Sequence, residues 1–417
     1  MPVLVDCVIV GGGAVGLAAA CHLGRAAAEQ RVHKQILVLE KAPRVGKKLL
    51  ATGNGTCNIT NMTASRENYH GAPALAERML SAFSPAQAVD FFTSIGVDCV
   101  TRPDGKVYPA SEQAAAVLDA LRLEAAALGV ETRCDCPVTA IAPSREGYRL
   151  TTPGGEITAR QVLVCVGGAA APALGGSAEG YRLLTDLGCE KTPLFPSIVQ
   201  LRTATDFVRA VKGIRVNGEV SLQLDGKRLD VANGEVLFTD YGLSGPAVMG
   251  ISRHAADWER RKRGEMTAKL NVLPDWDENT LTARIMERSA LRGRKLEDLL
   301  TGLLHKRVGQ TVLRVAGVTP LDRPANTLTE EECARVVAVI RGWEIPVTGT
   351  QGFGGAQVTA GGIDPSAFDP ATLMHRRYRG LYAAGEVLNV DGDCGGYNLQ
   401  FAWSCACVAA KTIAANW

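Results

Sequence analysis

The chain has 417 residues, 46% of them hydrophobic, which is enough for a large core and for two or more domains. Its 45 Lys and Arg against 43 Asp and Glu give a net charge of +2, which argues against a general nucleic-acid or membrane-surface role. No apolar run reaches the roughly 18 residues of a membrane span, and no charged segment precedes the first apolar stretch, so we expect a cytoplasmic protein. The 12 cysteines lack zinc-ligand spacing, so we expect reduced thiols and no metal site.

A dinucleotide-binding unit is predicted at the start of the chain, where an apolar run leads into GGGAVG and then into a helix of small residues. In this strand, turn and helix order, Gly11 permits the tight turn, Gly13 lets a pyrophosphate approach the backbone, and Gly16 lets the helix pack on the strand. The next apolar run, QILVLEK, ends at Glu40, where a carboxylate can accept hydrogen bonds from a ribose.

The segment Arg44–Asn61 is too rich in glycine and amides for a helix in the core. We interpret it as a second cradle for an anion and a ring. Lys47 and Lys48 can neutralise phosphate charge, while Gly53–Gly55 can lie flat against a planar ring and the asparagines supply amide donors and acceptors. A turn-rich surface loop is the alternative.

Two further strand-and-turn units follow. The apolar strand QVLVCV ends on Gly167 and Gly168, where FAD-binding folds return a glycine pair to the cofactor. Near the C-terminus, GLYAAGEVLNVDG ends a strand at Gly385 and places an acid, Glu386, next. The stretch DGDCGGYNLQFAW is then predicted to be a glycine turn at the N-terminus of the last helix, whose N–H dipoles can stabilise negative charge on a reduced flavin.

The cofactor signals lie at both ends of the chain, so the middle is predicted to be an insertion. We expect an α/β fold with a discontinuous Rossmann-like FAD-binding domain of the two-dinucleotide-fold flavoprotein type, over 1–192 and 346–417. The insertion is expected to form a β-barrel-like domain over 193–275, from antiparallel hairpins with Asn-Gly and Asp-Gly turns, and a helical cap over 276–345. In the cap, Thr329 is the predicted N-cap of a helix, with Glu332 completing a capping box. A second GxGxxG in strand and helix context is absent, so no dedicated NAD(P) domain is expected.

These motifs resemble one known family. The segments GGGAVGLAAA, VGKKLLATGNGTCNITN, DGKVYPASEQA, GEVLFTDYGLSGPAV and GLYAAGEVLNVDGDCGGYNLQFAW are similar to a bacterial family of FAD-dependent flavoproteins. Its members are labelled NAD(P)/FAD-dependent oxidoreductases or aminoacetone oxidase-family FAD-binding enzymes, and the group includes a bile-acid-inducible flavoprotein. The resemblance runs nearly end to end and implies non-covalent FAD, a cytosolic protein and a discontinuous cofactor domain. This chain has Thr56 where many members have a basic residue, and Cys394 where Thr is common.

The expected function is that of an FAD-dependent oxidoreductase acting on a small organic substrate by hydride transfer at flavin N5. The substrate is an activated C=C bond to be reduced, or an amine or alcohol to be oxidised, with NAD(P)H as a further electron donor. The alternative is a flavin-holding binding or regulatory protein attached to RNA, supported by the basic run Glu259–Gly264, which we otherwise interpret as a solvated helix end. The oligomeric state is left open, and the six dispersed histidines are interpreted as surface or core residues.

Two sets of site residues are predicted. The catalytic candidates near the ring are Tyr397, Asn398, Cys57 and Tyr108. The cofactor-binding candidates are Gly11, Gly13, Ala14, Gly16, Glu40, Lys41, Lys47, Lys48, Gly53, Asn54, Gly55, Asn58, Val138, Gly167, Gly168, Gly385, Glu386, Gly396, Tyr397, Asn398 and Leu399.

Overall fold

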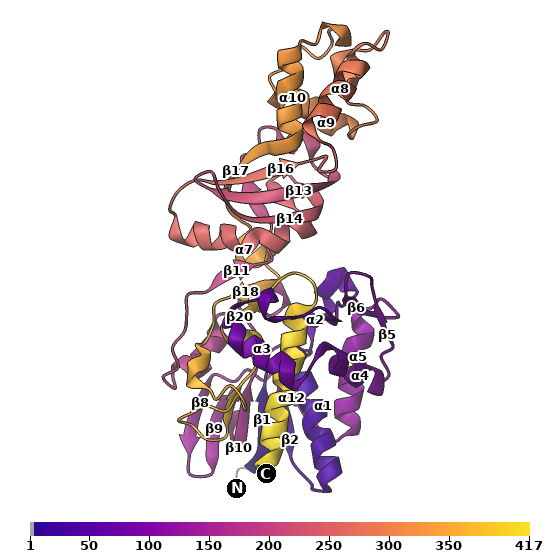
Figure 1. Cartoon of the computed structure of the whole chain (residues 1–417). Helices are drawn as coiled ribbons and strands as arrows, with labels where there is room; N and C mark the ends of the chain where they lie inside the picture. Colours follow the sequence, from indigo (N-terminus) through magenta and orange to yellow (C-terminus); the bar gives the residue numbers. More distant parts are fainter. Residues whose placement is uncertain (1–3) are drawn as a thin grey trace. The chain divides into compact units, whose positions relative to one another are not determined.

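A computed structural model describes residues 4–417, and the chain divides into two compact units (Figure 1). Unit 1 comprises the residues up to Pro196 together with Gln357–Trp417, and unit 2 comprises Ser197–Ala356. The predicted fold class is confirmed, because unit 1 contains a Rossmann-type mixed sheet and unit 2 a closed barrel. Across the described residues, no helix combines the length and the apolar character needed to cross a membrane.

The sheet of unit 1 has the order β7-β2-β1-β10-β9-β8, with β19 also paired to β10. Strands β7, β2, β1, β10 and β19 are parallel to their neighbours, whereas β9 and β8 form an antiparallel extension. Strands β1, β2 and β19 are largely buried apolar runs, as expected for strands covered by helices, whereas the edge strand β7 is polar and exposed. The bounds are β1 Leu4–Val10, β2 Ile36–Leu39, β7 Glu131–Arg133, β8 Ala140–Ser144, β9 Gly147–Thr152, β10 Gly155–Val164 and β19 Leu381–Ala383.

Helices α1 (Ala14–Gln30) and α12 (Tyr397–Ala415) pack against each other beside this sheet (Figure 1). Both are rich in buried alanine, and the small side chains let the two helices and the sheet approach closely. The first and last elements of the chain therefore share one core. The other helices of unit 1 are α2 Lys47–Leu50, α3 Pro73–Ala82, α4 Pro85–Ser94, α5 Ala114–Ala127 and α6 Arg182–Thr185.

Short strands add two small sheets around the start of α12. Strand β3 (Thr60–Asn61) pairs with β6 (Lys106–Pro109), which pairs with β5 (Cys99–Thr101). Strand β4 (Tyr69–Gly71) pairs antiparallel with β20 (Val390–Gly392), the last strand before α12. Segments from the beginning and the end of the sequence are thereby brought together.

Unit 2 is built on a closed barrel with the order β12-β15-β14-β13-β16-β17. The Asp-Gly turn prediction is confirmed, because Asp225 and Gly226 join β13 to β14 with φ of 48° and 77°. The Asn-Gly turn prediction is wrong. Gly218 lies inside β13, opposite Gly234 in β14, and a Cβ on Gly218 would be 2.5 Å from the Asn271 carbonyl oxygen, so close strand packing explains this glycine.

The bounds in unit 2 are β12 Leu201–Thr203, β13 Arg215–Leu224, β14 Lys227–Phe238, β15 Gly242–Ser244, α7 Pro246–Arg261, β16 Met266–Asn271, α8 Glu278–Ser289, α9 Lys306–Val315, α10 Glu330–Gly342, β17 Trp343–Thr350 and α11 Gly352–Gly355. Strands β11 Phe195–Ser197 and β18 Val358–Ala360 lie near the points where the chain passes between units.

Helix α10 of unit 2 begins at the residue that the sequence predicts. Thr329 caps α10, since its hydroxyl accepts from Glu332 N at 3.1 Å and the Glu332 carboxylate accepts from Thr329 N at 3.0 Å. The insertion extends further than residue 345, where the sequence division ended it. Strand β17 runs to Thr350 because it closes the barrel between β12 and β16.

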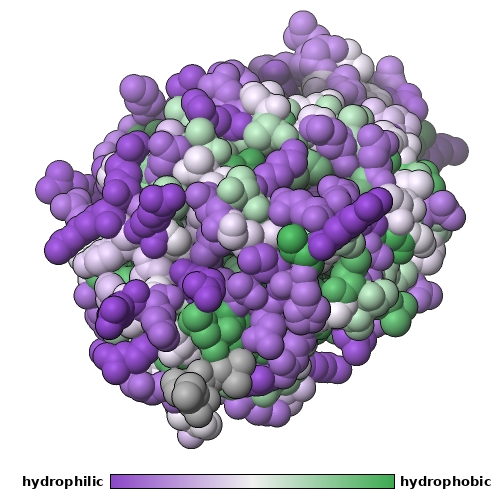
Figure 2. Space-filling view, turned by 90° about the horizontal axis from the view of Figure 1, so that it is seen from below, coloured by the Kyte–Doolittle hydropathy of each residue, from purple (hydrophilic) through white to green (hydrophobic). Residues whose placement is uncertain are grey.

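The surface agrees with the balanced charge of the chain. Figure 2 shows one face, seen from below, on which hydrophilic residues predominate and hydrophobic residues form small scattered groups. Such scattered exposure is ordinary for a globular protein and does not by itself mark a docking surface.

Candidate active site

In the first glycine turn, Gly11 and Gly16 are tightly packed against backbone, whereas Gly13 has free space beside it. A Cβ on Gly11, whose φ is 114°, would lie 2.5 Å from the Cys165 carbonyl oxygen, and one on Gly16 would overlap the Gly11 carbonyl oxygen. A Cβ on Gly13 would meet nothing within 4 Å. Gly13 caps α1 without a side-chain bond, so the first N–H groups of this 17-residue helix are directed at a space in which an anion can bind.

Glu40 holds this turn in place. Its Oε2 accepts from Gly12 N at 2.8 Å and its Oε1 accepts from Ala42 N at 2.8 Å. A carboxylate has further lone pairs, so Glu40 can still accept from a ribose hydroxyl. The residue predicted from the sequence as a ribose acceptor therefore also positions the glycine turn.

A second cluster joins four segments that are far apart in the sequence. Lys48 Nζ lies 2.7 Å from Glu386 Oε2, and Glu386 Oε1 accepts from Thr359 N at 2.9 Å. Thr359 Oγ1 in turn accepts from Ala170 N at 2.9 Å. A Cβ on Gly168 would lie 2.6 Å from Glu386 Oε1, so only glycine leaves room for the carboxylate here. Thr359 is part of this cluster and was not predicted, because its segment VTAGG carries no known cofactor spacing.

A buried hydroxyl lies in the same part of unit 1. Tyr181 is 1% exposed, and its hydroxyl has no hydrogen-bond partner among the described residues. Burial, followed by the nearby charge of Glu386, raises the pKa of Tyr181, so the hydroxyl keeps its proton and remains a donor. Sequence analysis missed this residue, because a lone tyrosine outside a motif gives no signal.

The C-terminal glycine turn is fixed by its own neighbours. Gly396 caps α12 with a φ of 96°, and its Cβ would lie 2.7 Å from the Thr60 carbonyl carbon and oxygen. The Asn398 amide accepts from Gly392 N at 2.8 Å and donates to Gly392 O at 2.8 Å. Because both ends of this amide are occupied by backbone, the side chain of Asn398 holds the turn, and its expected place near the ring stays a prediction.

The segment before β3 is anchored to α12 beside this turn. Trp403 Nε1 donates to Ile59 O at 2.9 Å, and Thr60 Oγ1 donates to the buried Gln400 Oε1 at 2.5 Å. Asn58 is buried next to Gly396, and its Oδ1 has no hydrogen-bond partner among the described residues. An unpaired buried acceptor costs about 1–3 kcal/mol, so a ligand donor is expected to complete it.

Two catalytic candidates occupy different environments. Cys57 is fully buried, and burial raises the pKa of its thiol to about 11, so the thiol is protonated at neutral pH. A buried, protonated thiol fits a structural residue better than a redox-active one. Tyr108 is half-buried under Arg102, whose guanidinium carbon lies 4.1 Å from the ring centroid, and its ring edge faces Gly53.

The remaining predicted site residues make few side-chain hydrogen bonds. Lys47 Nζ is 3.5 Å from Ala173 O, and Gly53 and Asn54 adopt left-handed conformations on an exposed turn. The others are Ala14 at the start of α1, exposed Lys41 and Gly55, half-buried Val138, Gly167 and Leu399, and buried Gly385.

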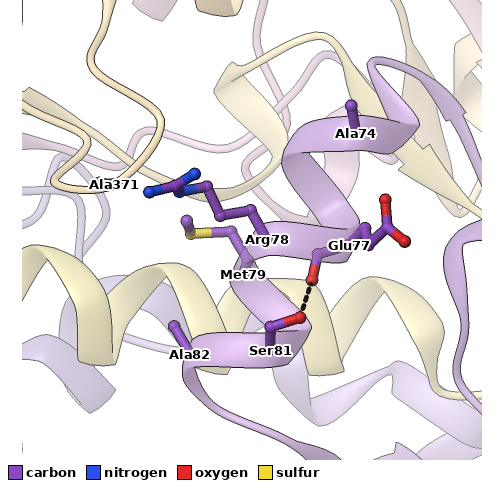
Figure 3. A pocket seen from close by; sticks show the side chains of 7 residues that line it. All are labelled: Ala74, Glu77, Arg78, Met79, Ser81, Ala82 and Ala371. Carbon is purple, nitrogen blue, oxygen red and sulfur yellow. Dashed lines mark hydrogen bonds between the residues drawn. The ribbon is translucent and has the colours of Figure 1, made fainter.

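An open hollow of about 590 Å³ lies elsewhere in unit 1, on one side of α3 (Figure 3). In the figure Arg78 points toward Ala371 and Glu77 points the other way. The Glu77 carboxylate is paired with Arg66 at 3.2 Å, so the hollow does not gather converging polar groups. The residues that line it are Ala74, Glu77, Arg78, Met79, Ser81, Ala82 and Ala371.

The donor set of unit 1 fits a dinucleotide bearing a flavin ring. It offers the open backbone of Gly13 at a helix N-terminus, the cation of Lys48, the unpaired Asn58 Oδ1 and the unpaired Tyr181 hydroxyl. Between residues 4 and 417, no group of three or more His, Cys, Asp or Glu is arranged to hold a metal ion.

Comparisons with known proteins extend this picture. Residues 5–412 match the family model described as the HI0933-like protein Rossmann domain. A 3-dehydro-bile acid delta(4,6)-reductase of Clostridium scindens is 33% identical over 408 residues, which cover 97% of this chain and 98% of that protein. A ribosomal RNA dihydrouridine synthase of Escherichia coli is 27% identical over 414 residues, which cover 98% of each. The solved 3-ketosteroid delta1-dehydrogenase of Sterolibacterium denitrificans has a TM-score of 0.51 and 14% identity, covering 99% of this chain and 100% of that one, which shows a shared fold.

Proposed function

Since the chain belongs to the HI0933-like family of FAD-dependent oxidoreductases, as its motifs predict, we propose that it reduces a C=C bond conjugated to a carbonyl group in a ring compound. The observation that carries this proposal is the end-to-end identity of 33% with a protein named for the reduction of bile-acid double bonds. The name of the Escherichia coli relative also describes the saturation of a ring double bond, that of uridine.

The residues of unit 1 are assigned the following work. The N–H groups at the start of α1 hold the cofactor diphosphate beside Gly13, while Glu40 accepts from the adenosine ribose. Lys48 contributes positive charge, and Glu386 orients it through their 2.7 Å ion pair. Bound FAD supplies hydride chemistry at N5, and the protein supplies orientation and electrostatics.

The turn before α12 is assigned to the flavin ring. The first N–H groups of α12, from Tyr397 onward, form a patch of partial positive charge that favours negative charge on a reduced ring. Asn58 Oδ1, which has no partner among the described residues, would accept from an N–H of bound flavin, and Tyr397 and Tyr108 would contact its ring. Tyr69 supports this arrangement by donating from its hydroxyl to Tyr397 O at 2.9 Å.

The alternative function, a flavin-holding protein bound to RNA, depended on the basic run Glu259–Gly264. In unit 2 this run ends α7, and Arg260 and Arg261 both pair with Asp257 at 2.8 Å. Part of its charge is therefore neutralised locally, so we prefer the reductase. A ribosomal RNA fragment is included among the substrates to be tested, because the Escherichia coli relative is named for a reaction on ribosomal RNA.

The test is an anaerobic single turnover. The FAD-loaded protein is photoreduced and mixed with a steroid 4,6-dien-3-one, with the matching saturated ketone, with an amine, or with a uridine-containing ribosomal RNA fragment. We expect the oxidised flavin spectrum to return with the dienone and the saturated product to appear, while the saturated ketone and the amine have no effect. NADH and NADPH are then compared as donors for a second turnover. If no conjugated ketone reoxidises the flavin, the proposal fails, and reoxidation by RNA alone would assign the RNA substrate.

A further inference from the structure

His70 and Asp393 form a side-chain pair next to the C-terminal glycine turn. His70 Nε2 lies 2.9 Å from Asp393 Oδ1, and the two side chains are 37% and 35% exposed. Each is thus partly sheltered and still reachable from solvent or by a ligand. His70 lies outside the cofactor motifs, whereas Asp393 belongs to the stretch DGDCGGYNLQFAW that leads into α12.

The carboxylate of this pair is held on several sides. Asn68 Nδ2 donates to Asp393 Oδ2 at 3.3 Å, and Asp393 N donates to Asn68 O at 2.9 Å. The strand that carries His70 is itself paired with β20, with His70 opposite Asp391. The imidazole is therefore oriented by a fixed carboxylate, which is the arrangement that sets a histidine tautomer for proton transfer.

The strand pairing brings His70 close to the turn to which the flavin ring is assigned. Strand β20 leads through Asp393 and the glycine turn directly into α12. Tyr69, the neighbour of His70 in β4, is buried against Tyr397 with ring centroids 6.3 Å apart, while the His70 side chain pairs with Asp393 just before the glycine turn. One end of β4 thus contributes both a support for α12 and a titratable group beside it.

Other histidines of unit 1 have structural surroundings. His22 stacks on Phe91 at 4.6 Å with a buried Nε2, and His375 Nδ1 accepts from Arg377 N at 3.0 Å. His33 is exposed on the loop after α1. Of these, His70 combines a carboxylate partner, partial exposure and a position beside the glycine turn.

We propose that His70 is the proton donor of the reaction, an inference that rests on the proposed function above. Saturating a conjugated C=C bond needs a hydride and a proton. The hydride comes from the reduced flavin and adds to the carbon β to the carbonyl, which leaves an enolate and oxidised FAD. The enolate carbon α to the carbonyl then takes the Nδ1 proton of the His70 imidazolium, which leaves a neutral imidazole whose Nε2–H is still donated to Asp393. Neutral His70 regains its proton from solvent through its exposed edge, so the cycle balances.

The first experiment uses His70→Gln in the FAD-loaded protein, with His33→Gln as the matched control. General acids contribute about 10²–10⁴-fold in rate, so His70→Gln is expected to slow single-turnover reoxidation by the dienone about 100-fold or more, with FAD affinity within about twofold. His33→Gln should behave as wild type. A His70→Gln protein that binds FAD and turns over at the wild-type rate would overturn the assignment.

Two further readouts separate proton donation from a structural role. In His70→Ala, added imidazole should restore at least a tenth of the lost rate, which a packing defect would not permit. In the wild type, carbethoxylation of His70 by diethyl pyrocarbonate, followed by mass spectrometry, should slow when FAD and the saturated ketone are added, while His33 reacts unchanged. Absence of both rescue and protection would reject His70 as the donor, even if the first variant misfolds.

Failure of this inference is distinguishable from failure of the proposed function. If wild-type protein is reoxidised by the dienone while the His70 variants match it, the reductase stands and the donor is wrong. If wild-type protein is not reoxidised by any conjugated ketone, the proposed function itself falls.

Discussion

Replacing Gly396 by alanine should loosen the start of α12 and weaken FAD binding together. Its φ of 96° lies in the left-handed region, which costs about 1–2 kcal/mol for a residue with a Cβ. The new Cβ would also lie 2.7 Å from the Thr60 carbonyl group and 2.9 Å from Asn58 Oδ1. Crowding of this kind against backbone costs about 1–3 kcal/mol, so the free energy of unfolding should fall by about 2–5 kcal/mol.

A matched control isolates the crowding from the backbone strain. Gly188 has a similar φ of 88°, is exposed, and offers an added Cβ no neighbour within 4 Å. Gly188→Ala should therefore show only the strain, about 1–2 kcal/mol, and unchanged FAD affinity. Gly396→Ala should additionally raise the FAD dissociation constant at least about tenfold, which corresponds to about 1.4 kcal/mol.

The assay is urea unfolding of both apoproteins and titration of each with FAD by flavin fluorescence. Equal losses of unfolding free energy in the two variants would show that the Thr60 contact does not constrain the turn. Wild-type FAD affinity in a folded Gly396→Ala protein would remove the reason for placing the flavin at the start of α12.

Three further predictions concern the same unit. Glu40→Gln replaces one acceptor of a backbone N–H by an amide NH2. We expect the free energy of unfolding to fall by about 1–2 kcal/mol and the FAD dissociation constant to rise roughly tenfold. An unchanged FAD titration would contradict the role of Glu40. Burial, then the charges of Arg25 and Lys411, lowers the pKa of His22 to about 4. The neutral imidazole is therefore fully compatible with the folded state above about pH 6.5. As the pH falls toward 4, the free energy of unfolding should drop by up to about 3 kcal/mol. His22→Leu should flatten this part of the curve of unfolding free energy against pH, and a wild-type fall in the variant would show that other groups cause it. Gln400→Leu leaves Thr60, Phe83 O and Ser404 without the buried hydrogen bonds that they make to Gln400. The free energy of unfolding measured in urea should fall by about 2–4 kcal/mol, and a fall below about 1 kcal/mol would contradict this prediction.

The family and the fold class were predictable because their signals are local. A strand, a GxGxxG turn and a helix of small residues form one continuous segment, and Gly11 and Gly16 there answer steric demands from within the turn and from the neighbouring strand β10 and the residues after it. The Asp-Gly hairpin and the capping box at Thr329 are equally local, and both were predicted correctly.

Other predictions failed or went unmade where distant segments decide the environment. The Asn-Gly pairs have turn composition, yet Gly218 and Gly234 lie opposite each other within β13 and β14, and a Cβ on Gly218 would crowd the Asn271 carbonyl oxygen. The sequence did not show that the Asn398 amide bonds to the backbone of Gly392, or that burial keeps the Cys57 thiol protonated.

By itself, the sequence predicted a dinucleotide site at the first glycine turn, acids and glycines that recur after later strands, and an insertion in the middle of the chain. Only the tertiary structure decided which of those groups meet. It brought Lys48 to Glu386 and His70 to Asp393, pairs separated by more than 300 positions along the chain. The physical reason is that strand pairing and the packing of α12 against α1 are cooperative, long-range effects, and no window of neighbouring residues encodes them.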